Sequence, residues 1–419
     1  MSKIVPVNLG DVAPATLRVA LAFGISLFFI WGLAYGLLDV LNKHFQDTLK
    51  VGTAQSTWLQ IAYFGAYLLI SLPAGSYIQH FGYKVGILTG LFVTAAGAFL
   101  FIPAAGIGQF APFVGAMFVL AAGLACLETS ADSYVTVLGP AEGASRRLNL
   151  AQSFNGLGTF IGPLIGGSFF FVDGAQTANG SSHDTVRLIY AGIGVAIALF
   201  ALFVARTELP ELSEETHDAP GRAGTLMRPH FVFGVVTQAI YVGAQVGIGA
   251  LFINIALTTW GALTPRGAAY LLSLALLLYM IGRFASTALL TRVQPRTLLG
   301  CFGAMNVLLS IVVAANLGRI SLVAMIGVFF FMSTMFPTIF ALGVRELGPS
   351  TKRGASFMVM AIGGGVLFPY PMGLVAEGYG APTAFILPAA AFLLVALYAW
   401  RGARIREDRP AASSASEPR

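Results

Sequence analysis

Residues 110–132 read FAPFVGAMFVLAAGLACLETSAD, an apolar run whose only charged residues are Glu128 and Asp132 near its end. A helix of about 20 apolar residues is long enough to cross the hydrocarbon core of a bilayer. A carboxylate inside such a run is costly and is usually functional, facing a cavity or a polar partner rather than lipid. The stretch therefore predicts a membrane-spanning helix that carries functional acids. Asp39 repeats the pattern in an apolar run near the N-terminus.

Similar apolar runs recur along the whole chain of 419 residues. Hydrophobic residues make up 57% of the sequence and charged residues only 10%, whereas soluble domains carry roughly 25% charge. We therefore predict an all-α membrane protein with twelve transmembrane helices. The expected spans are 18–42, 56–79, 84–103, 109–138, 146–172, 187–206, 229–258, 266–291, 296–315, 319–345, 353–376 and 381–401.

The chain divides near its middle and its two parts repeat. Residues 207–228 are polar and acidic, which is typical of a cytoplasmic linker between a six-helix bundle at 1–206 and a second one at 229–401. Leu138-Gly139-Pro140 and Leu347-Gly348-Pro349 each precede basic residues and a glycine-rich helix. Parallel six-helix repeats predict the major facilitator fold, with the binding site near the middle of the membrane. Residues 402–419 are of low complexity, and we expect a disordered cytoplasmic tail.

The net charge of +6 follows the membrane and is no sign of nucleic-acid binding. Under the twelve-helix prediction with both termini in the cytoplasm, most of the 24 lysines and arginines fall on the cytoplasmic side. This bias is the one that sets the orientation of multi-pass proteins. Proline inside the expected spans, at Pro163, Pro337, Pro369 and Pro371, predicts kinked or broken helices next to a cavity. The 49 glycines predict helices that pack closely through small residues.

Enzyme functions are disfavoured. The sequence has no glycine-rich phosphate loop followed by Lys-Ser/Thr, no nucleophile elbow and no histidine–carboxylate constellation. Cys126 and Cys301 lie far apart in apolar spans, and the five histidines have no second ligand at metal spacing. We therefore expect no catalytic residue, no metal, no cofactor and no ATP-driven transport.

Five segments together resemble the fucose/proton symporter family of the major facilitator superfamily. They are FFIWG at 28–32 leading to LDVL at 38–41, AAGLACLET at 121–129 leading to VTVLGP at 135–140, RLNLAQSFN at 147–155, YVGAQVG at 241–247, and FPTIFALG at 336–343 followed by 352–365. The resemblance implies a coupling aspartate at Asp39 and a substrate-linked, proton-carrying glutamate at Glu128. It also implies a bacterial inner-membrane protein, which we expect to be a monomer.

The acids have competing interpretations. Asp39 can couple or gate proton movement, or it can be a structural carboxylate bonded to a neighbouring helix. Asp132 follows Glu128 by four residues on the same helix face, and two carboxylates that close tend not to ionise together. Alternatively, Asp132 lies nearer the cytoplasmic mouth and is solvated.

Neutral polar residues form stripes along two expected helices. Amides and hydroxyls suit a sugar, whose hydroxyl groups both donate and accept hydrogen bonds. The alternative is that they bond helix to helix. The candidate substrate-binding residues, besides Glu128, are Gln152, Asn155, Tyr241, Gln245, Tyr35, Asn149, Gln238 and Asn254. We assign Arg283 a structural role.

These observations predict a proton-coupled symporter that imports a neutral monosaccharide, a hexose or deoxyhexose such as fucose, glucose or galactose, by alternating access. The partners are the sugar, protons and the lipid bilayer. The alternatives are a facilitative sugar uniporter, a proton-coupled carrier of another neutral polyol-like or drug-like solute, and a membrane sensor that transports nothing.

Overall fold

The computed structural model describes residues 14–138, 144–171, 182–207, 228–290, 292–345, 347 and 351–402. The side chains of Asp132 and Asn149 lie outside this description, as do most of the expected linker at 207–228 and all but the first residue of the expected tail. Every described element is helical. Eleven helical segments are long and apolar enough to span a membrane, which confirms the all-α membrane class.

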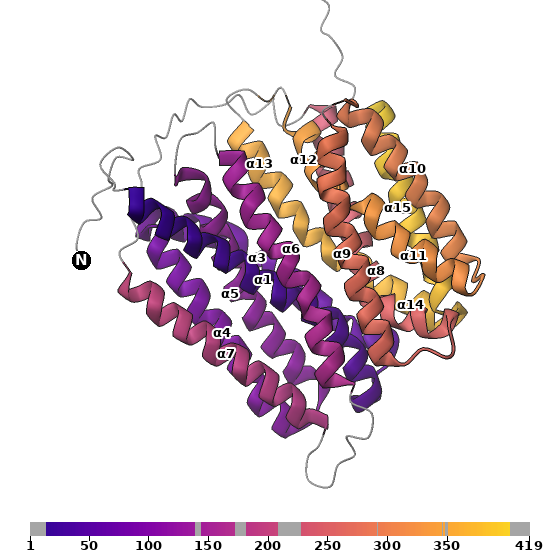
Figure 1. The fold of residues 1–419 in the computed structure, drawn as a ribbon, viewed down its shortest axis with the longest axis horizontal. Coiled ribbons are helices and arrows are strands. Elements are labelled where there is room, and N and C mark those ends of the chain that lie inside the picture. The colour runs from indigo at the N-terminus through magenta and orange to yellow at the C-terminus, as the bar shows by residue number, and fades with distance from the viewer. Residues whose placement is uncertain are drawn as a thin grey trace, which may run out of the picture.

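The first part of the chain forms long, continuous helices. They are α1 (Pro14–Leu49), the short α2 (Thr53–Ser56), α3 (Trp58–Phe81), α4 (Tyr83–Ile107), α5 (Phe110–Val137), α6 (Ala144–Phe170) and α7 (Ser182–Arg206). The expected span 146–172 is not among the eleven. It corresponds to α6, which is 27 residues long but less apolar than the other spans because it carries Gln152, Ser153 and Asn155. Figure 1 shows these helices, coloured indigo to magenta, gathered on one side of the molecule.

The second part contains broken helices. It comprises α8 (Pro229–Thr259), α9 (Pro265–Leu289), α10 (Pro295–Ala314), α11 (Arg319–Met332), α12 (Met335–Gly343), α13 (Thr351–Met360), α14 (Pro369–Tyr379) and α15 (Ile386–Leu397). A 3₁₀ turn at Ala361–Val366 separates α13 from α14, a second at Ala381–Phe385 precedes α15, and a π-helical turn at Tyr398–Gly402 follows it. Figure 1 shows these elements in orange and yellow on the other side.

The prediction of broken helices at proline is confirmed in the second half, where two expected spans are interrupted. The expected span 319–345 breaks between Met332 and Met335, just before Pro337, and the span 353–376 breaks before Pro369. Pro163, in contrast, lies inside α6, which continues through it without a break. The ring of a proline removes one backbone hydrogen bond, which neighbouring helices can compensate. Interruptions of the spans are therefore concentrated in the second half.

Glycine permits the closest helix contact in the first half, as expected from the glycine content. A Cβ atom at Gly162 of α6 would lie 2.6 Å from the backbone carbon of Gly36 in α1, and one at Gly36 would lie 2.5 Å from the Thr159 carbonyl oxygen. The two helices therefore touch backbone to backbone, which is the packing that small residues allow inside a membrane.

Side-chain contacts join the two halves at the end of the bundle where α1 finishes, here called the Leu49 end. Asn42 Nδ2 donates to the Ala250 carbonyl of α8 at 2.9 Å. The Ala54 amide donates to Glu377 Oε1 of α14 at 2.8 Å. α1 runs seven residues beyond its expected end because His44, Phe45 and Gln46 in its last two turns are buried rather than exposed as a loop. His44 packs on Phe170 and Phe45 on Phe113 of the first half, and Gln46 accepts from Asn254 of the second. The halves are therefore closed at the Leu49 end.

Candidate functional site

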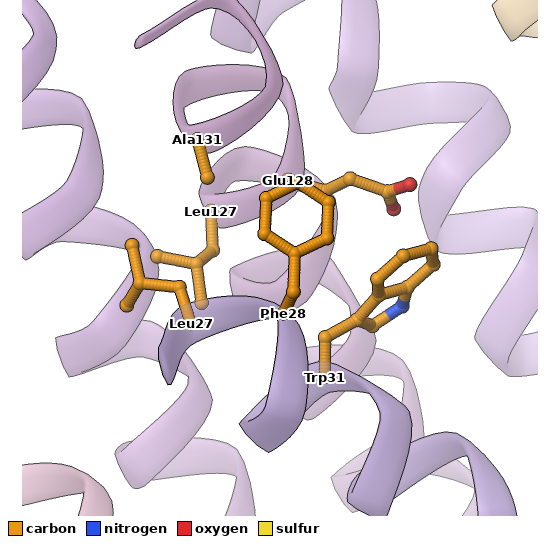
Figure 2. A pocket seen from close by; sticks show the side chains of 6 residues that line it. All are labelled: Leu27, Phe28, Trp31, Leu127, Glu128 and Ala131. Carbon is orange, nitrogen blue, oxygen red and sulfur yellow. The ribbon is translucent and has the colours of Figure 1, made fainter. Parts of the chain in front are cut away.

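Glu128 lines a small pocket between α5 and α1. The other lining residues are Leu27, Phe28, Trp31, Leu127 and Ala131 (Figure 2). The cavity volume is about 10 Å³, close to the minimum that one water molecule requires. In Figure 2 the Glu128 side chain extends beyond the Phe28 ring, and its carboxylate lies on the same side as the Trp31 indole. The acid therefore faces the interior of the bundle, as expected for a functional carboxylate.

Aromatic side chains from α1 and α3 extend this pocket. Trp31 Nε1 donates a hydrogen bond to the Tyr63 hydroxyl at 3.1 Å. The Tyr63 and Tyr67 rings are stacked, with their centroids 5.3 Å apart. The hydroxyls of both tyrosines lie within electrostatic range of Glu128. Tyr35, a predicted binding residue, packs against Tyr63 with a centroid distance of 6.0 Å. The result is an aromatic wall with hydroxyl groups beside a carboxylate.

Tyr63 and Tyr67, together with Gln60, were missed by the sequence analysis. They lie at spacings of three and four residues on α3, the same spacing that marked the stripes on α6 and α8. The signal was present in WLQIAYFGAY at 58–67, but the apolar residues around it mark the segment as an ordinary span. A polar stripe inside a span indicates a helix face that meets protein or a cavity rather than lipid. The same rule identifies the polar face of α3.

Asp39 lies two turns beyond Trp31 on α1 and is only 6% exposed. Gln60 Nε2 donates to its Oδ1 atom at 3.3 Å. On its other side the carboxylate rests against Gly249 of α8, where a Cβ atom would lie 2.5 Å from Oδ2. Asp39 therefore sits at the junction of the two halves, with one neighbour from each.

The amides of α6 approach the same region from the first half. Asn155 is half-buried, and its Nδ2 donates to the Phe28 carbonyl at 3.3 Å. Because Phe28 also lines the Glu128 pocket, Asn155 lies next to that pocket. Gln152 is likewise half-buried on α6. The structure thus places Asn155 beside Phe28 at the Glu128 pocket, and Tyr35 about two turns further along α1 against Tyr63.

The predicted residues of α8 are differently placed. Tyr241 is fully buried, and its hydroxyl donates to the Met332 carbonyl at 2.9 Å, at the break between α11 and α12. Asn254 lies at the Leu49 end and donates to Gln46 Oε1 at 2.7 Å. Gln245 is half-buried. Gln238 is fully buried, and among the described residues neither of its amide atoms has a hydrogen-bond partner. The α8 stripe is therefore spread along the helix rather than gathered at Glu128.

Arg283 lies inside α9 rather than in a loop. Its Nη2 donates to the Tyr279 hydroxyl at 3.1 Å, and its guanidinium lies 4.9 Å from the centre of the same ring. The structural role assigned to Arg283 stays a prediction.

Comparisons with known proteins agree with this fold. Residues 20–369 match the model of the Major Facilitator Superfamily. The chain is 33% identical to a glucose/galactose transporter of Brucella abortus, covering 90% of this chain and 92% of the relative. It is 35% identical to the L-fucose-proton symporter of Escherichia coli, covering 89% of this chain and 91% of the relative.

Solved structures give the same result. The crystal structure of the transporter FucP in the outward conformation superposes with a TM-score of 0.69 at 34% identity, covering 93% of this chain and 100% of that one. A bacterial homologue of the lysosomal transporter Spinster, in an inward-facing conformation, has a TM-score of 0.75 at 13% identity. The second likeness concerns the fold alone.

Proposed function

Because the chain belongs to the major facilitator superfamily, we infer that it is a transporter, not an enzyme, and that it carries a neutral monosaccharide together with a proton. Relatives that match nine-tenths of the chain are named as a fucose-proton symporter and as glucose/galactose transporters. The candidate sugars are therefore fucose, glucose and galactose. We further propose that the protein lies in the bacterial inner membrane as a monomer, with both termini in the cytoplasm.

The observation that carries this proposal is the position of Glu128. A carboxylate in an apolar helix lines a pocket with Phe28 and Trp31, and Asn155 of α6 donates to the Phe28 carbonyl. An aromatic ring can stack on the apolar face of a sugar, while carboxylate, amide and hydroxyl groups bond its hydroxyls. A carboxyl group can also take up and release a proton. One site can thus bind the sugar and exchange the proton, as a symporter requires.

We propose separate roles for the predicted residues. Glu128 is the proton carrier linked to the substrate, and Asp39 serves proton coupling or gating at the junction of the halves. Gln152, Asn155 and Tyr35 bind the sugar from the first half. Gln245 binds from the second half, while Tyr241, Gln238 and Asn254 reach the sugar only if the halves rearrange. Asp132 and Asn149 keep the roles given by the sequence, as a second acid beside Glu128 and as part of the α6 stripe.

The geometry also requires movement. A cavity of about 10 Å³ beside Glu128 is far too small for a monosaccharide, and the Leu49 end is closed by bonds between the halves. Sugar entry therefore needs the halves to separate around the site, which is the alternating-access motion of this fold.

Transport assays in proteoliposomes test the proposal. Counterflow of radiolabelled fucose, glucose and galactose identifies a carrier and its sugar, and sugar-induced alkalinisation of the outer medium identifies proton symport. Counterflow without alkalinisation would indicate a uniporter. Binding without counterflow would indicate a sensor, and failure of all three sugars together with activity towards another polyol would replace the substrate class.

A further inference from the structure

Three successive contacts join α1 to α8 across the two halves. Asp39 rests on Gly249, Asn42 Nδ2 donates to the Ala250 carbonyl at 2.9 Å, and Asn254 Nδ2 donates to Gln46 Oε1 at 2.7 Å. The residue numbers rise together on both helices, so the helices run side by side in the same direction towards the Leu49 end. Two contacts of this α1–α8 seam are hydrogen bonds, and the third is the close approach of the Asp39 carboxylate to Gly249.

The seam has room for Asp39 only because residue 249 has no side chain. A Cβ atom there would lie 2.5 Å from Oδ2, 3.2 Å from Cγ and 3.4 Å from Oδ1 of Asp39. Cβ atoms in real structures essentially never approach a neighbour that closely, and Asp39 sits on a helix whose backbone is itself held by α6. A side chain at 249 must therefore displace the Asp39 carboxylate, either by rotating it away from its position beside Gln60 or by moving α1 away from α8.

The space around the Asp39 carboxylate, here called its seat, is bounded by residues of both halves. Gln60 of α3 donates to Oδ1 from the first half, and the bare backbone of Gly249 covers Oδ2 from the second. Tyr35, one turn earlier on α1, is the titratable group that interacts with Asp39 from its own helix. Separation of the halves removes only the Gly249 wall. The carboxyl group is therefore enclosed when the seam is formed and open to water when it is broken.

We propose that Gly249 is a positioning residue for Asp39: its missing side chain provides a seat in the second half for the carboxyl group of the first. Exchange of a proton at Asp39 is then confined to states in which the Leu49 end is open. This inference rests on the proposed coupling role of Asp39, while the seat itself is a matter of packing and is testable without transport.

A double-mutant cycle measures the coupling between Gly249 and Asp39 directly. Spin labels at Gln55→Cys and Tyr379→Cys, both exposed and on opposite halves at the Leu49 end, report the distance across this end in protein lacking Cys126 and Cys301. We expect Gly249→Ala to shift the ratio of open to closed states by about tenfold or more, the size of effect that overpacking produces. In the Asp39→Ala background the same change should have no effect, since the carboxylate that the methyl group meets is gone.

Gly247→Ala is the matched control. It makes the same change two residues away on α8, but its Cβ meets the flexible Met372 side chain of the same half, so the distance across the Leu49 end should not change. Asp39→Glu enlarges the other partner of the same contact. Its extra methylene overfills the space at Gly249 and should open the Leu49 end, which keeps the test available if Gly249→Ala does not fold. An equal shift from Gly249→Ala with and without the Asp39 carboxylate, or no shift from either Gly249→Ala or Asp39→Glu, would overturn the proposal.

Transport separates this inference from the proposed function. If Asp39→Asn still accumulates sugar while the cycle shows coupling, Asp39 is not the coupling acid but the seat stands. If Asp39→Asn abolishes accumulation while the cycle shows no coupling, Asp39 couples protons without the help of Gly249.

Discussion

The two halves share a fold and differ in chemistry. The expected spans of the first half carry Asp39, Glu128 and Asp132, whereas those of the second half hold no acid. Glu377 follows the expected span 353–376, near the end of α14 and at the Leu49 end. In the described part of the first half one span is interrupted, at Thr57 between α2 and α3, whereas three spans of the second half contain breaks or non-α turns. The two halves therefore differ in what they contribute: one half holds the candidate proton-exchanging groups, and the other contains most of the interrupted helices.

The division also explains why the contact between the halves is important. A carboxyl group in one half responds to movement of the other half only through residues that contact both halves. Asp39 is in such contact through Gly249, whereas the pocket that Glu128 lines is formed by α1 and α5 of the first half. Glu128 thus fits a role in the substrate site and Asp39 a role at the junction, and the predictions below test that assignment.

Glu128→Gln should have the largest effect. The amide keeps the shape of the side chain but cannot carry a proton, so accumulation of sugar against a gradient should be lost while sugar exchange survives. Uptake driven by an imposed proton gradient and counterflow, measured on the same proteoliposomes, separate the two. Asp47→Asn removes a carboxylate that pairs with Lys43 at the solvent-accessible Leu49 end. It makes the same chemical change outside the proposed site, and is the control that should behave as the parent. Accumulation at the parent level by Glu128→Gln would remove Glu128 from the coupling mechanism.

Asp39→Asn should block net uptake but leave sugar binding measurable, because Asp39 lies outside the Glu128 pocket. Calorimetry gives the affinity and uptake gives the rate, with Asp47→Asn again as the control. If binding is lost together with uptake, Asp39 belongs to the substrate site, and the division between site acid and junction acid is wrong.

The fold was largely predictable from sequence because membrane crossing imposes a length and an apolar composition on each segment. The helices α4, α5 and α10 begin and end close to the bounds expected from their apolar runs. The site was only partly predictable. Glu128 and Asp39 stand out since charge is rare in a span, but Tyr63 and Tyr67 are amphipathic and look like ordinary span residues. The contact of Asp39 with Gly249 joins distant parts of the chain, and no periodicity within one helix reveals which glycine meets which acid.

Alanine substitution of the amides should have intermediate effects. Loss of one hydrogen bond costs about 0.5–1.5 kcal/mol, which is roughly a few-fold to tenfold in affinity. We expect this weakening for Gln152→Ala and Asn155→Ala in the first half and for Gln245→Ala in the second, measured by calorimetry. Larger losses for the first two would strengthen the view that the first half dominates recognition. Unchanged affinity in all three variants would place the sugar elsewhere.

The smallest effect is expected where the halves are most alike. Lys84, at the start of α4, donates to the carbonyls of Ala205 at 3.1 Å and Thr207 at 2.8 Å, at the end of α7. Arg296, in the corresponding place at the start of α10, donates to the Ala399 carbonyl at 3.2 Å, at the end of the last span. A cation at a helix C-terminus stabilises the unpaired carbonyls and the helix dipole by about 0.3–1 kcal/mol.

Lys84→Met and Arg296→Met should therefore each lower the thermal stability of the detergent-solubilised protein slightly and by similar amounts, with sugar affinity and proton coupling unchanged. Thermal unfolding followed by tryptophan fluorescence, with counterflow on the same samples, makes the comparison. The control is Arg266→Met, at an exposed position where the guanidinium bonds the Tyr270 hydroxyl rather than a helix end. A loss of coupling from either cap variant would mean that these matched contacts do more than hold each half together. In that case the similarity of the halves would extend from their fold to their part in transport.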